Sequence, residues 1–182
     1  MKSNHVDSID GVTVMPVKSV SDARGTFIKF DPTVYLQNSL ASIALSFNPI
    51  KGTLRGMHFQ VEPFAEEKLV TCVQGSIFDV IIDLRPNSRT LGKWTSFEMS
   101  ALETSQVYLP KGIAHGFQTL EAESIVHYGL SSSYSDEFSF AINPLKGINI
   151  EWPLKPSKIS DKDSNGIDIS LAIDKYAKSI KN

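Results

Sequence analysis

Ile77-Phe-Asp-Val-Ile-Ile-Asp83 is the stretch of sequence that indicates the fold class. The side chains at positions 78, 80 and 82 are all apolar, whereas those at 77, 79, 81 and 83 alternate between isoleucine and aspartate. Successive side chains of a β-strand point to opposite faces, so this pattern predicts a strand with one apolar face and one mixed face. A mixed face turned inward suits the wall of a cavity.

Similar β-rich runs recur on both sides of this strand, with turn sequences such as Asp22-Ala-Arg-Gly25 and Pro110-Lys-Gly112 between them. Without crossover helices, evenly spaced short strands pair antiparallel, and we predict an all-β jelly roll. No linker divides the chain, so residues 1–182 are expected to form one domain. The further predicted strands are residues 41–47, 68–73, 105–109 and 124–130.

Only the C-terminal region, residues 164–182, has a helical pattern. Ile169, Ile173, Tyr176 and Ile180 recur with a period near 3.6, and three lysines follow late in the segment, where cations favour a helix dipole. The pattern predicts one short helix of about three turns.

Composition excludes several classes of function. The 182 residues include 18 Lys and Arg against 20 Asp and Glu, and a net charge of −2 gives no electrostatic footprint for nucleic acid. The longest apolar runs are strand-sized, well short of the roughly 20 residues of a membrane span, and the N-terminus lacks a signal region, so we expect a cytoplasmic protein. The single cysteine, Cys72, excludes an internal disulfide and is expected to be a small buried side chain.

The four histidines are the candidates for chemistry. His5 lies near the N-terminus and receives no role, and His127 shares a strand with Tyr128, so that one of the two faces inward. His58 lies in Leu54-Arg-Gly-Met-His-Phe-Gln60, where strict alternation puts Arg55 on the face opposite His58 unless the glycine introduces a bulge. His115 follows a tight turn. Taken alone, either His58 or His115 is more typical of a structural histidine than of a catalytic one.

A metal site is one candidate, because the turn before His115 resembles that of the cupin barrels. In these barrels a His-x-His motif, a carboxylate and a later histidine hold the metal. Here Gln60 stands where the second histidine is expected, although Glu66 or Glu67 could supply an oxygen. A neutral amide is a poor ligand for a transition metal, so we predict no metal and no other cofactor.

Metal-free chemistry is available to the same residues. His58 is a candidate general base, and a carboxylate on its other nitrogen would fix its tautomer. Lys68 could neutralise a developing oxyanion, and Tyr128 could donate a proton from the opposite side. Together these roles describe proton abstraction next to a carbonyl. The structural alternative is a Lys68 at the barrel rim and a Tyr128 that fills the core.

An ordered set of motifs resembles the dTDP-4-dehydrorhamnose 3,5-epimerase family, the cupin-fold epimerases of nucleotide-diphospho-4-keto-6-deoxy sugars. The resemblance extends from about residue 11 to residue 163 and implies a cupin-type double-stranded β-helix. It implies epimerisation at carbon 3 and carbon 5 without a cofactor, in deoxysugar biosynthesis. The motifs are Leu54-Arg-Gly-Met-His-Phe-Gln60, Lys68-Leu-Val70, Val73-Gln-Gly-Ser-Ile-Phe-Asp-Val80, Asp83-Leu-Arg85, Gly92-Lys-Trp94, Leu109-Pro-Lys-Gly-Ile-Ala-His-Gly-Phe117, Ile150-Glu-Trp-Pro153 and Ser160-Asp-Lys-Asp163.

The resemblance also implies roles for individual residues. It makes His58 the base, Asp163 its partner, Tyr128 the opposing acid and Lys68 the neighbour of the enolate oxygen. It implies a homodimer in which an N-terminal arm, residues 1–35, is exchanged and carries Arg24 to the other subunit's site. The residues implied to bind the nucleotide-sugar substrate are Arg24, Phe27, Lys29, Arg55, Gln60, Asp79, His115, Tyr134 and Lys162.

Three departures from the family's pattern cluster where the nucleotide base is held. Lys29 replaces an acid, a gapless match puts Ile43 and Leu45 at the positions of Gln-x-Asn, and Ser133 replaces an aromatic residue before Tyr134. We expect that the base, or the sugar attached to it, differs from that of the thymidine-linked hexose. The alternatives are an epimerase of one centre acting on a CDP- or GDP-linked sugar, a cupin ketoisomerase, a metal-dependent cupin enzyme and a non-catalytic nucleotide-sugar binder.

Overall fold

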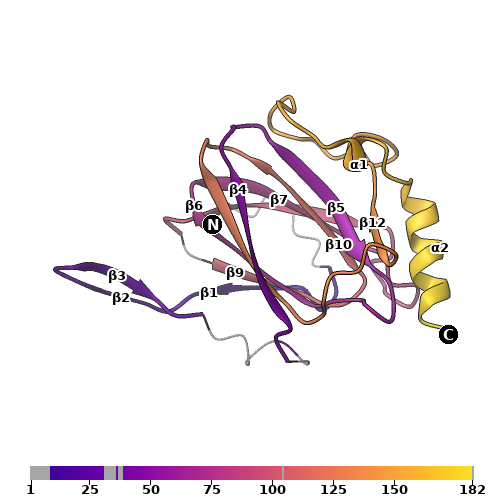
Figure 1. Ribbon diagram of the computed structural model, residues 1–182, viewed down its shortest axis with the longest axis horizontal. Helices are drawn as coiled ribbons and strands as arrows, with labels where there is room; N and C mark the ends of the chain where they lie inside the picture. The colour runs from indigo at the N-terminus through magenta and orange to yellow at the C-terminus, as the bar shows by residue number, and fades with distance from the viewer. Residues whose placement is uncertain (1–8, 31–35, 37–38, 104, 182) are drawn as a thin grey trace.

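Two five-stranded antiparallel sheets form the body of the protein (Figure 1). The structure is a computed structural model that describes residues 9–30, 36, 39–103 and 105–181. One sheet has the order β1 (Thr13–Pro16), β9 (Ser105–Leu109), β6 (Lys68–Gln74), β11 (Ser124–Leu130) and β4 (Ser42–Asn48). The other has the order β12 (Ser139–Ala141), β5 (Leu54–Gln60), β10 (Ile113–Thr119), β7 (Ser76–Asp83) and β8 (Trp94–Ser100). The predicted all-β jelly roll is confirmed.

Strand β7 confirms the two-faced pattern seen in the sequence. Ile77 and Ile81 are fully buried in the core between the two sheets, and Asp79 is buried on that same face. Val80 and Ile82 pack on the opposite face, in a second core that joins the sheet to the C-terminal helix. The aspartate is therefore a polar group inside an otherwise apolar sandwich, which calls for a specific partner.

The described chain contains two helices, of which the C-terminal one packs on the outer face of the second sheet. The predicted C-terminal helix is α2 (Ile169–Ser179), which is capped by Asp168 and buries Ala172 and Tyr176. Ile180 was expected on the apolar face, but it is the C-cap and is 44% exposed. A one-turn helix, α1 (Asp161–Ser164), precedes α2 and was not predicted. Within the described chain, neither helix has the length and apolar character that crossing a membrane requires.

A hairpin of β2 (Ser19–Asp22) and β3 (Gly25–Ile28) projects away from the body (Figure 1). Its paired residues Val20 and Phe27 are 69% and 70% exposed. A two-stranded hairpin is marginally stable on its own in water, so exposed apolar side chains at this position need another surface to cover them. The hairpin belongs to the expected arm, residues 1–35, of which positions 1–8, including His5, and 31–35 lie outside the described residues.

The outer face of the first sheet carries a second exposed apolar surface. Ile43, Leu45 and Phe47 on the edge strand β4 are 63%, 51% and 65% exposed. His127 lies on the neighbouring strand opposite Leu45, and its ring stacks on Phe30 with a centroid distance of 5.7 Å. Burial lowers the pKa of His127. As expected for adjacent residues of one strand, Tyr128 faces the other way, into the interior.

Candidate active site

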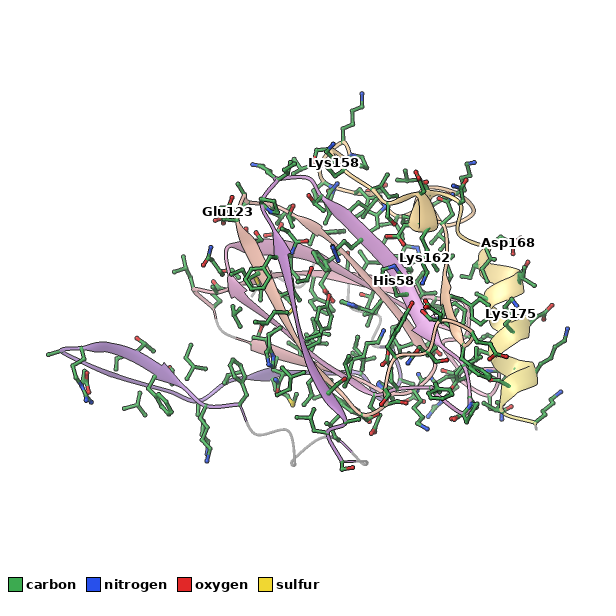
Figure 2. The ribbon with its side chains drawn as sticks, viewed as in Figure 1. His58, Glu123, Lys158, Lys162, Asp168 and Lys175 are labelled. Atoms are coloured by element: carbon green, nitrogen blue, oxygen red, sulfur yellow. The ribbon has the colours of Figure 1, made fainter. Side chains whose placement is uncertain are left out.

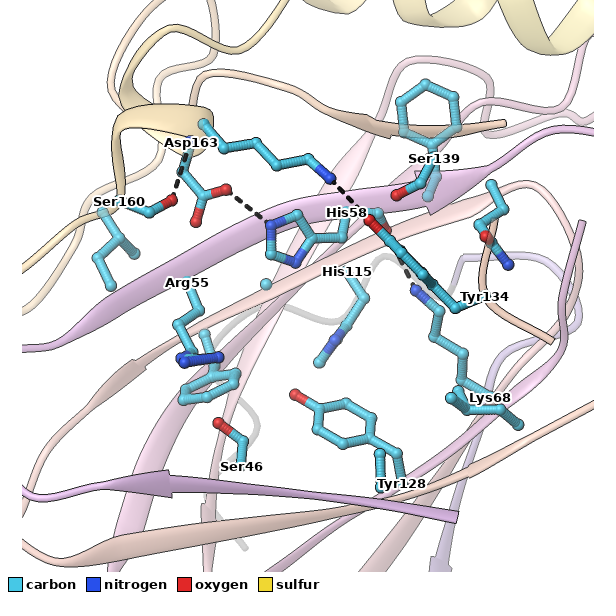
Figure 3. A pocket seen from close by; sticks show the side chains of 18 of the residues that line it. Ser46, Arg55, His58, Lys68, His115, Tyr128, Tyr134, Ser139, Ser160 and Asp163 are labelled. Atoms are coloured by element: carbon cyan, nitrogen blue, oxygen red, sulfur yellow. Dashed lines mark hydrogen bonds and ion pairs between the residues drawn. The ribbon is translucent and has the colours of Figure 1, made fainter. Parts of the chain in front are cut away.

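A cavity of about 680 Å³ lies between the sheets and opens beside α1 (Figure 3). Strands of both sheets contribute to its wall, and so does the segment that ends in α1. His58, Lys68, Tyr128 and Asp163, the four predicted catalytic residues, all line it. The candidate substrate-binding residues Arg55, Gln60, His115, Tyr134 and Lys162 line it as well.

A bulge in β5 brings Arg55 and His58 to the same face. His58 pairs with His115 on β10, whereas Arg55 pairs with Phe117, so that the register shifts between the two positions. Strict alternation would have turned Arg55 away from the cavity. The bulge at Gly56 breaks this alternation and turns Arg55 toward the cavity instead. Gly56 has φ +112°, and a Cβ atom there would lie 2.5 Å from Gly116 Cα and 2.7 Å from the His115 carbonyl oxygen. Only glycine fits this close approach of two strands.

His58 is held by a carboxylate from the other end of the chain. Its Nε2 lies 2.7 Å from Asp163 Oδ1, and the backbone N–H of Gly56 donates to Asp163 Oδ2 at 3.0 Å. Burial alone would raise the pKa of Asp163, but the hydrogen bond and charge of His58, together with the Gly56 N–H, lower it. The carboxylate is therefore ionised and can stabilise an imidazolium, while the other ring nitrogen of His58 is the one that can act on a ligand.

Asp163 is in turn positioned by the cap of α1. Its backbone N–H donates to Ser160 Oγ at 3.1 Å, which begins the one-turn helix. Ser160 belongs to a motif quoted above, but the sequence did not predict a role for it. The signal was present, because a serine followed by acidic residues in the next turn is typical of a helix N-terminus.

Tyr128 lies across the cavity from His58, on the other sheet, and contacts a buried pair formed by His115 and Asp79 (Figure 3). Tyr128 packs edge-on against His115, with a centroid distance of 5.8 Å. Burial, together with the negative charge of Asp79, raises the pKa of Tyr128, so that its hydroxyl keeps its proton at neutral pH. His115 Nε2 lies 2.7 Å from Asp79 Oδ1, and burial raises the pKa of Asp79 despite this partner. Asp79 thus has the partner that its burial in the core calls for.

Lys68 lies at the start of β6 and is 6% exposed. Its Nζ donates to the carbonyl oxygen of His58 at 3.2 Å and lies 3.3 Å from Glu66 Oε1. The structural alternative of a lysine at the solvent-exposed rim is therefore wrong. The ammonium is a buried positive charge inside the cavity, close to the candidate base.

Gln60 fixes the loop that carries Tyr134. Its Oε1 accepts from the backbone N–H of Ser135 at 2.8 Å, and its Nε2 donates to the carbonyl oxygen of Ser133 at 3.2 Å. Lys162, labelled with His58 in Figure 2, donates to the hydroxyl of Tyr134 at 3.3 Å. Lys162 and Tyr134 thus meet across the mouth of the cavity, above His58 (Figure 3).

Four predicted substrate-binding residues do not line this cavity. Asp79 is fully buried and contacts His115 instead, and the other three belong to the N-terminal arm. Arg24, Phe27 and Lys29 are exposed in or next to the hairpin, and Arg24 pairs with Asp22 at 2.6 Å. The gapless match also selected the β4 residues that point away from the cavity. Ile43 and Leu45 face outward, and Ala44 and Ser46 are the β4 residues that line the cavity.

The residues weighed as metal ligands have other partners. His58 and His115 each bond an aspartate, Glu66 pairs with Lys68, and Glu67 accepts from the hydroxyl of Tyr108 at 2.6 Å. Over the described ranges, no three His, Cys, Asp or Glu side chains are grouped in a way that could hold a metal ion. The single cysteine, Cys72, is buried as expected, and burial raises the pKa of its thiol to about 11.

The fold and the cavity define a cupin-type enzyme whose side chains are arranged for acid–base chemistry, with an imidazole on one wall and a protonated tyrosine on the other. The model of the dTDP-4-dehydrorhamnose 3,5-epimerase family matches residues 7–170. The chain belongs to this family and is an isomerase that acts on carbohydrates.

Individual relatives agree with this assignment. The dTDP-4-dehydrorhamnose 3,5-epimerase of Sinorhizobium fredii is 38% identical over 167 residues, which cover 87% of this chain and 85% of the relative. The dTDP-4-dehydrorhamnose 3-epimerase of Streptomyces niveus is 32% identical, covering 91% and 83%. The epimerase of Legionella pneumophila, solved with dTDP-4-keto-L-rhamnose, is 32% identical with a TM-score of 0.84, and the match covers 90% of each chain.

Proposed function

We propose that this protein epimerises a nucleotide-diphospho-4-keto-6-deoxy sugar at carbon 3 and carbon 5 without a metal, as a step in deoxysugar biosynthesis. The observation that carries the proposal is the pairing of His58 with Asp163 on one wall of the cavity and the position of Tyr128 on the other. A protein that only binds a nucleotide sugar has no need of a base that faces an acid. The cytoplasm is the proposed compartment, because its reducing conditions suit a free thiol such as that of Cys72.

The chemistry follows from the acidity of C–H bonds next to a ketone. His58 removes a proton from the carbon beside the carbonyl, and Asp163 stabilises the imidazolium that forms. The ammonium of Lys68 stabilises the negative charge that moves to the carbonyl oxygen. Tyr128 then delivers a proton to the opposite face of the carbon, which inverts the centre. Base and oxyanion stabilisation each contribute roughly two to four powers of ten to such a reaction.

Cations at the mouth suit the diphosphate. Arg55 lines the cavity near Tyr128, and Lys162 lies at the entrance beside Tyr134. A guanidinium binds phosphate oxygens in pairs, and a lysine supplies a point charge. Tyr134, which is 62% exposed, offers a ring on which a nucleotide base could stack.

The proposed working unit is a homodimer with exchanged hairpins. Among the described residues, Phe27 on the hairpin of β2 and β3 is 70% exposed, and Leu45 and Phe47 on the outer face of β4 are 51% and 65% exposed. One second copy of the chain would cover both surfaces and would bring Arg24 of the partner subunit toward the cavity. This arrangement accounts for the position of Arg24 outside the cavity of its own subunit.

Leu45→Glu should convert the dimer to monomer over a range of protein concentrations in which the unaltered protein stays dimeric. Burying a carboxylate in an apolar interface costs several kcal/mol, and each 1.4 kcal/mol, approximately, raises Kd tenfold. Sedimentation equilibrium measures the change. The matched control is Leu102→Glu, because Leu102 is 96% exposed in a turn and should tolerate the charge. A Leu45→Glu protein with the unaltered Kd would contradict the proposed interface.

A single-centre epimerase is the second candidate function, because the similar protein of Streptomyces niveus is named a 3-epimerase. Incubation with dTDP-4-keto-6-deoxyglucose, followed by reduction and NMR of the sugar, identifies the inverted carbons. We expect inversion at both. Inversion at carbon 3 alone would replace the double epimerase with the second candidate.

The same assay with CDP- and GDP-linked sugars tests the altered base site. Ala44 and Ser46 leave the β4 wall with only one hydroxyl group, and Lys29 places a positive charge on the arm. We expect the thymidine-linked sugar not to be the preferred one. Equal affinity for all three nucleotides would remove the support for an altered site.

A further inference from the structure

Glu66 is an acidic side chain inside the cavity to which the proposed mechanism gives no role. It belongs to the loop between β5 and β6 and lines the cavity together with His58 and Lys68. Its side chain is only 11% exposed. A carboxylate this buried is costly unless it is paired and hydrogen-bonded, so its contacts indicate what it does.

Both oxygens of Glu66 have partners. Oε1 lies 3.3 Å from Lys68 Nζ, and Oε2 accepts from Gln60 Nε2 at 3.3 Å. The two N–H groups of Gln60 Nε2 are shared among Glu66 Oε2 and the carbonyl oxygens of Phe64 and Ser133, and Gln60 Oε1 accepts from the N–H of Ser135. The amide of Gln60 therefore holds Oε2 of the Glu66 carboxylate, and Oε1 of the same carboxylate faces Lys68.

The ammonium of Lys68 has three N–H groups and contacts two oxygens. One N–H donates to the carbonyl oxygen of His58 at 3.2 Å, and Nζ forms an ion pair with Glu66 Oε1 at 3.3 Å. These two contacts set the rotation of the tetrahedral ammonium and leave an N–H that is directed at neither oxygen. Because the carbonyl oxygen that accepts this bond belongs to the residue that carries the base, the direction of the ammonium is set relative to His58.

We propose that Glu66 is a positioning residue: together with the His58 carbonyl, it aims the remaining N–H of Lys68 at the oxygen on which negative charge develops. The second half of this statement rests on the proposed function. A lysine has a flexible four-carbon stem, and its charge is effective only where it is held. Glu66 keeps the ammonium in place before the substrate binds, so that no reorganisation is needed during the reaction.

Two substitutions separate the position of the oxygen from its charge. Glu66→Ala removes the acceptor and frees the stem of Lys68, and we expect kcat to fall about tenfold to a hundredfold with KM nearly unchanged, as displacement of a catalytic group by about 1 Å does. Glu66→Gln keeps an acceptor oxygen in the same place, so kcat should stay within about threefold of the unaltered protein. Glu62→Ala is the matched control, since it removes an acid from the same loop whose partner, Lys111, is outside the cavity.

A spectroscopic readout tests the positioning independently of turnover. In protein labelled with ¹⁵N-lysine, a held and shielded ammonium gives a resolved ¹H–¹⁵N signal, which Lys68→Met assigns by its loss. The signal should disappear in Glu66→Ala and persist in Glu66→Gln and Glu62→Ala. A signal that persists in Glu66→Ala overturns the positioning role. If the signal behaves as expected but the unaltered protein does not turn over the sugar, the proposed function fails while the positioning of Lys68 stands.

Discussion

His58→Ala lowers kcat by about a thousandfold, because a positioned general base contributes between roughly 10² and 10⁴ to proton transfer. The fold should survive, since the side chain of His58 is 41% exposed and lines a cavity rather than filling the core. The loss should appear in kcat, with the affinity for the nucleotide diphosphate retained through Arg55 and Lys162. Steady-state kinetics, with circular dichroism to check the fold, measures the effect.

His127→Ala is the matched control for this experiment. The side chain of His127 lies on the outer face of the first sheet, where its ring stacks on Phe30. The kcat of His127→Ala, measured at a concentration at which variant and unaltered protein have the same oligomeric state, should remain near that of the unaltered protein. If His58→Ala keeps more than a tenth of the activity, another group removes the proton and the assignment of the base is wrong.

Gly56→Ala lowers the free energy of unfolding by about 3 kcal/mol or more, the largest effect on stability expected of a single methyl group here. Two costs add at this position. The added Cβ would lie 2.5 Å from Gly116 Cα, so the two strands must separate, and φ is +112°, a conformation that alanine rarely adopts. The bulge that turns Arg55 into the cavity would be lost at the same time. Urea unfolding followed by tryptophan fluorescence measures the change.

Two other glycines separate these costs. Gly116→Ala adds a methyl group 2.6 Å from the Arg55 carbonyl oxygen at a residue without the positive φ, so it tests contact alone. Gly147→Ala tests conformation alone, because φ is +74° and nothing lies within 4 Å of the added atom. We expect Gly147→Ala to cost about 1 kcal/mol and Gly116→Ala to cost more. A Gly56→Ala protein no less stable than Gly147→Ala would contradict the close approach of β5 and β10.

The strands and the candidate catalytic residues could be predicted because they depend on local patterns. The alternation in residues 77–83 reports directly which side of β7 is buried, and the period of residues 169–180 reports the helix. Motifs located His58, Lys68 and Tyr128, and the structure places all three in one cavity. Each of these inferences needs only residues that are close together in the sequence.

The remaining features depend on contacts between distant segments. The sequence around Gly56 allows a bulge but does not require one, and the bulge is fixed by the pairing with Gly116 on β10. The same holds for β4, where a gapless match indicated Ile43 and Leu45, although Ala44 and Ser46 face the cavity. A shift of one residue in a strand exchanges its two faces, and short matches do not detect it.

The role of Glu66 was missed for a related reason. In the sequence it is one of two adjacent acids, and it was considered only as a metal ligand. Its partners Gln60 and Lys68 lie on either side of one loop, and their approach to a single carboxylate becomes visible only when the loop is folded. Arg24 is a different case. The surface expected to receive it belongs to a second chain, so its partners cannot be found within a single subunit.

Hydrogen exchange at the sugar is the most direct test of the central claim that inversion proceeds by removal and return of a proton beside the ketone. The protein is incubated in heavy water with dTDP-4-keto-6-deoxyglucose, and deuterium in the product is located by NMR. We predict one deuterium at each inverted carbon in the unaltered protein and none in His58→Ala. An inverted product that keeps its original hydrogens at carbons 3 and 5 would contradict the account.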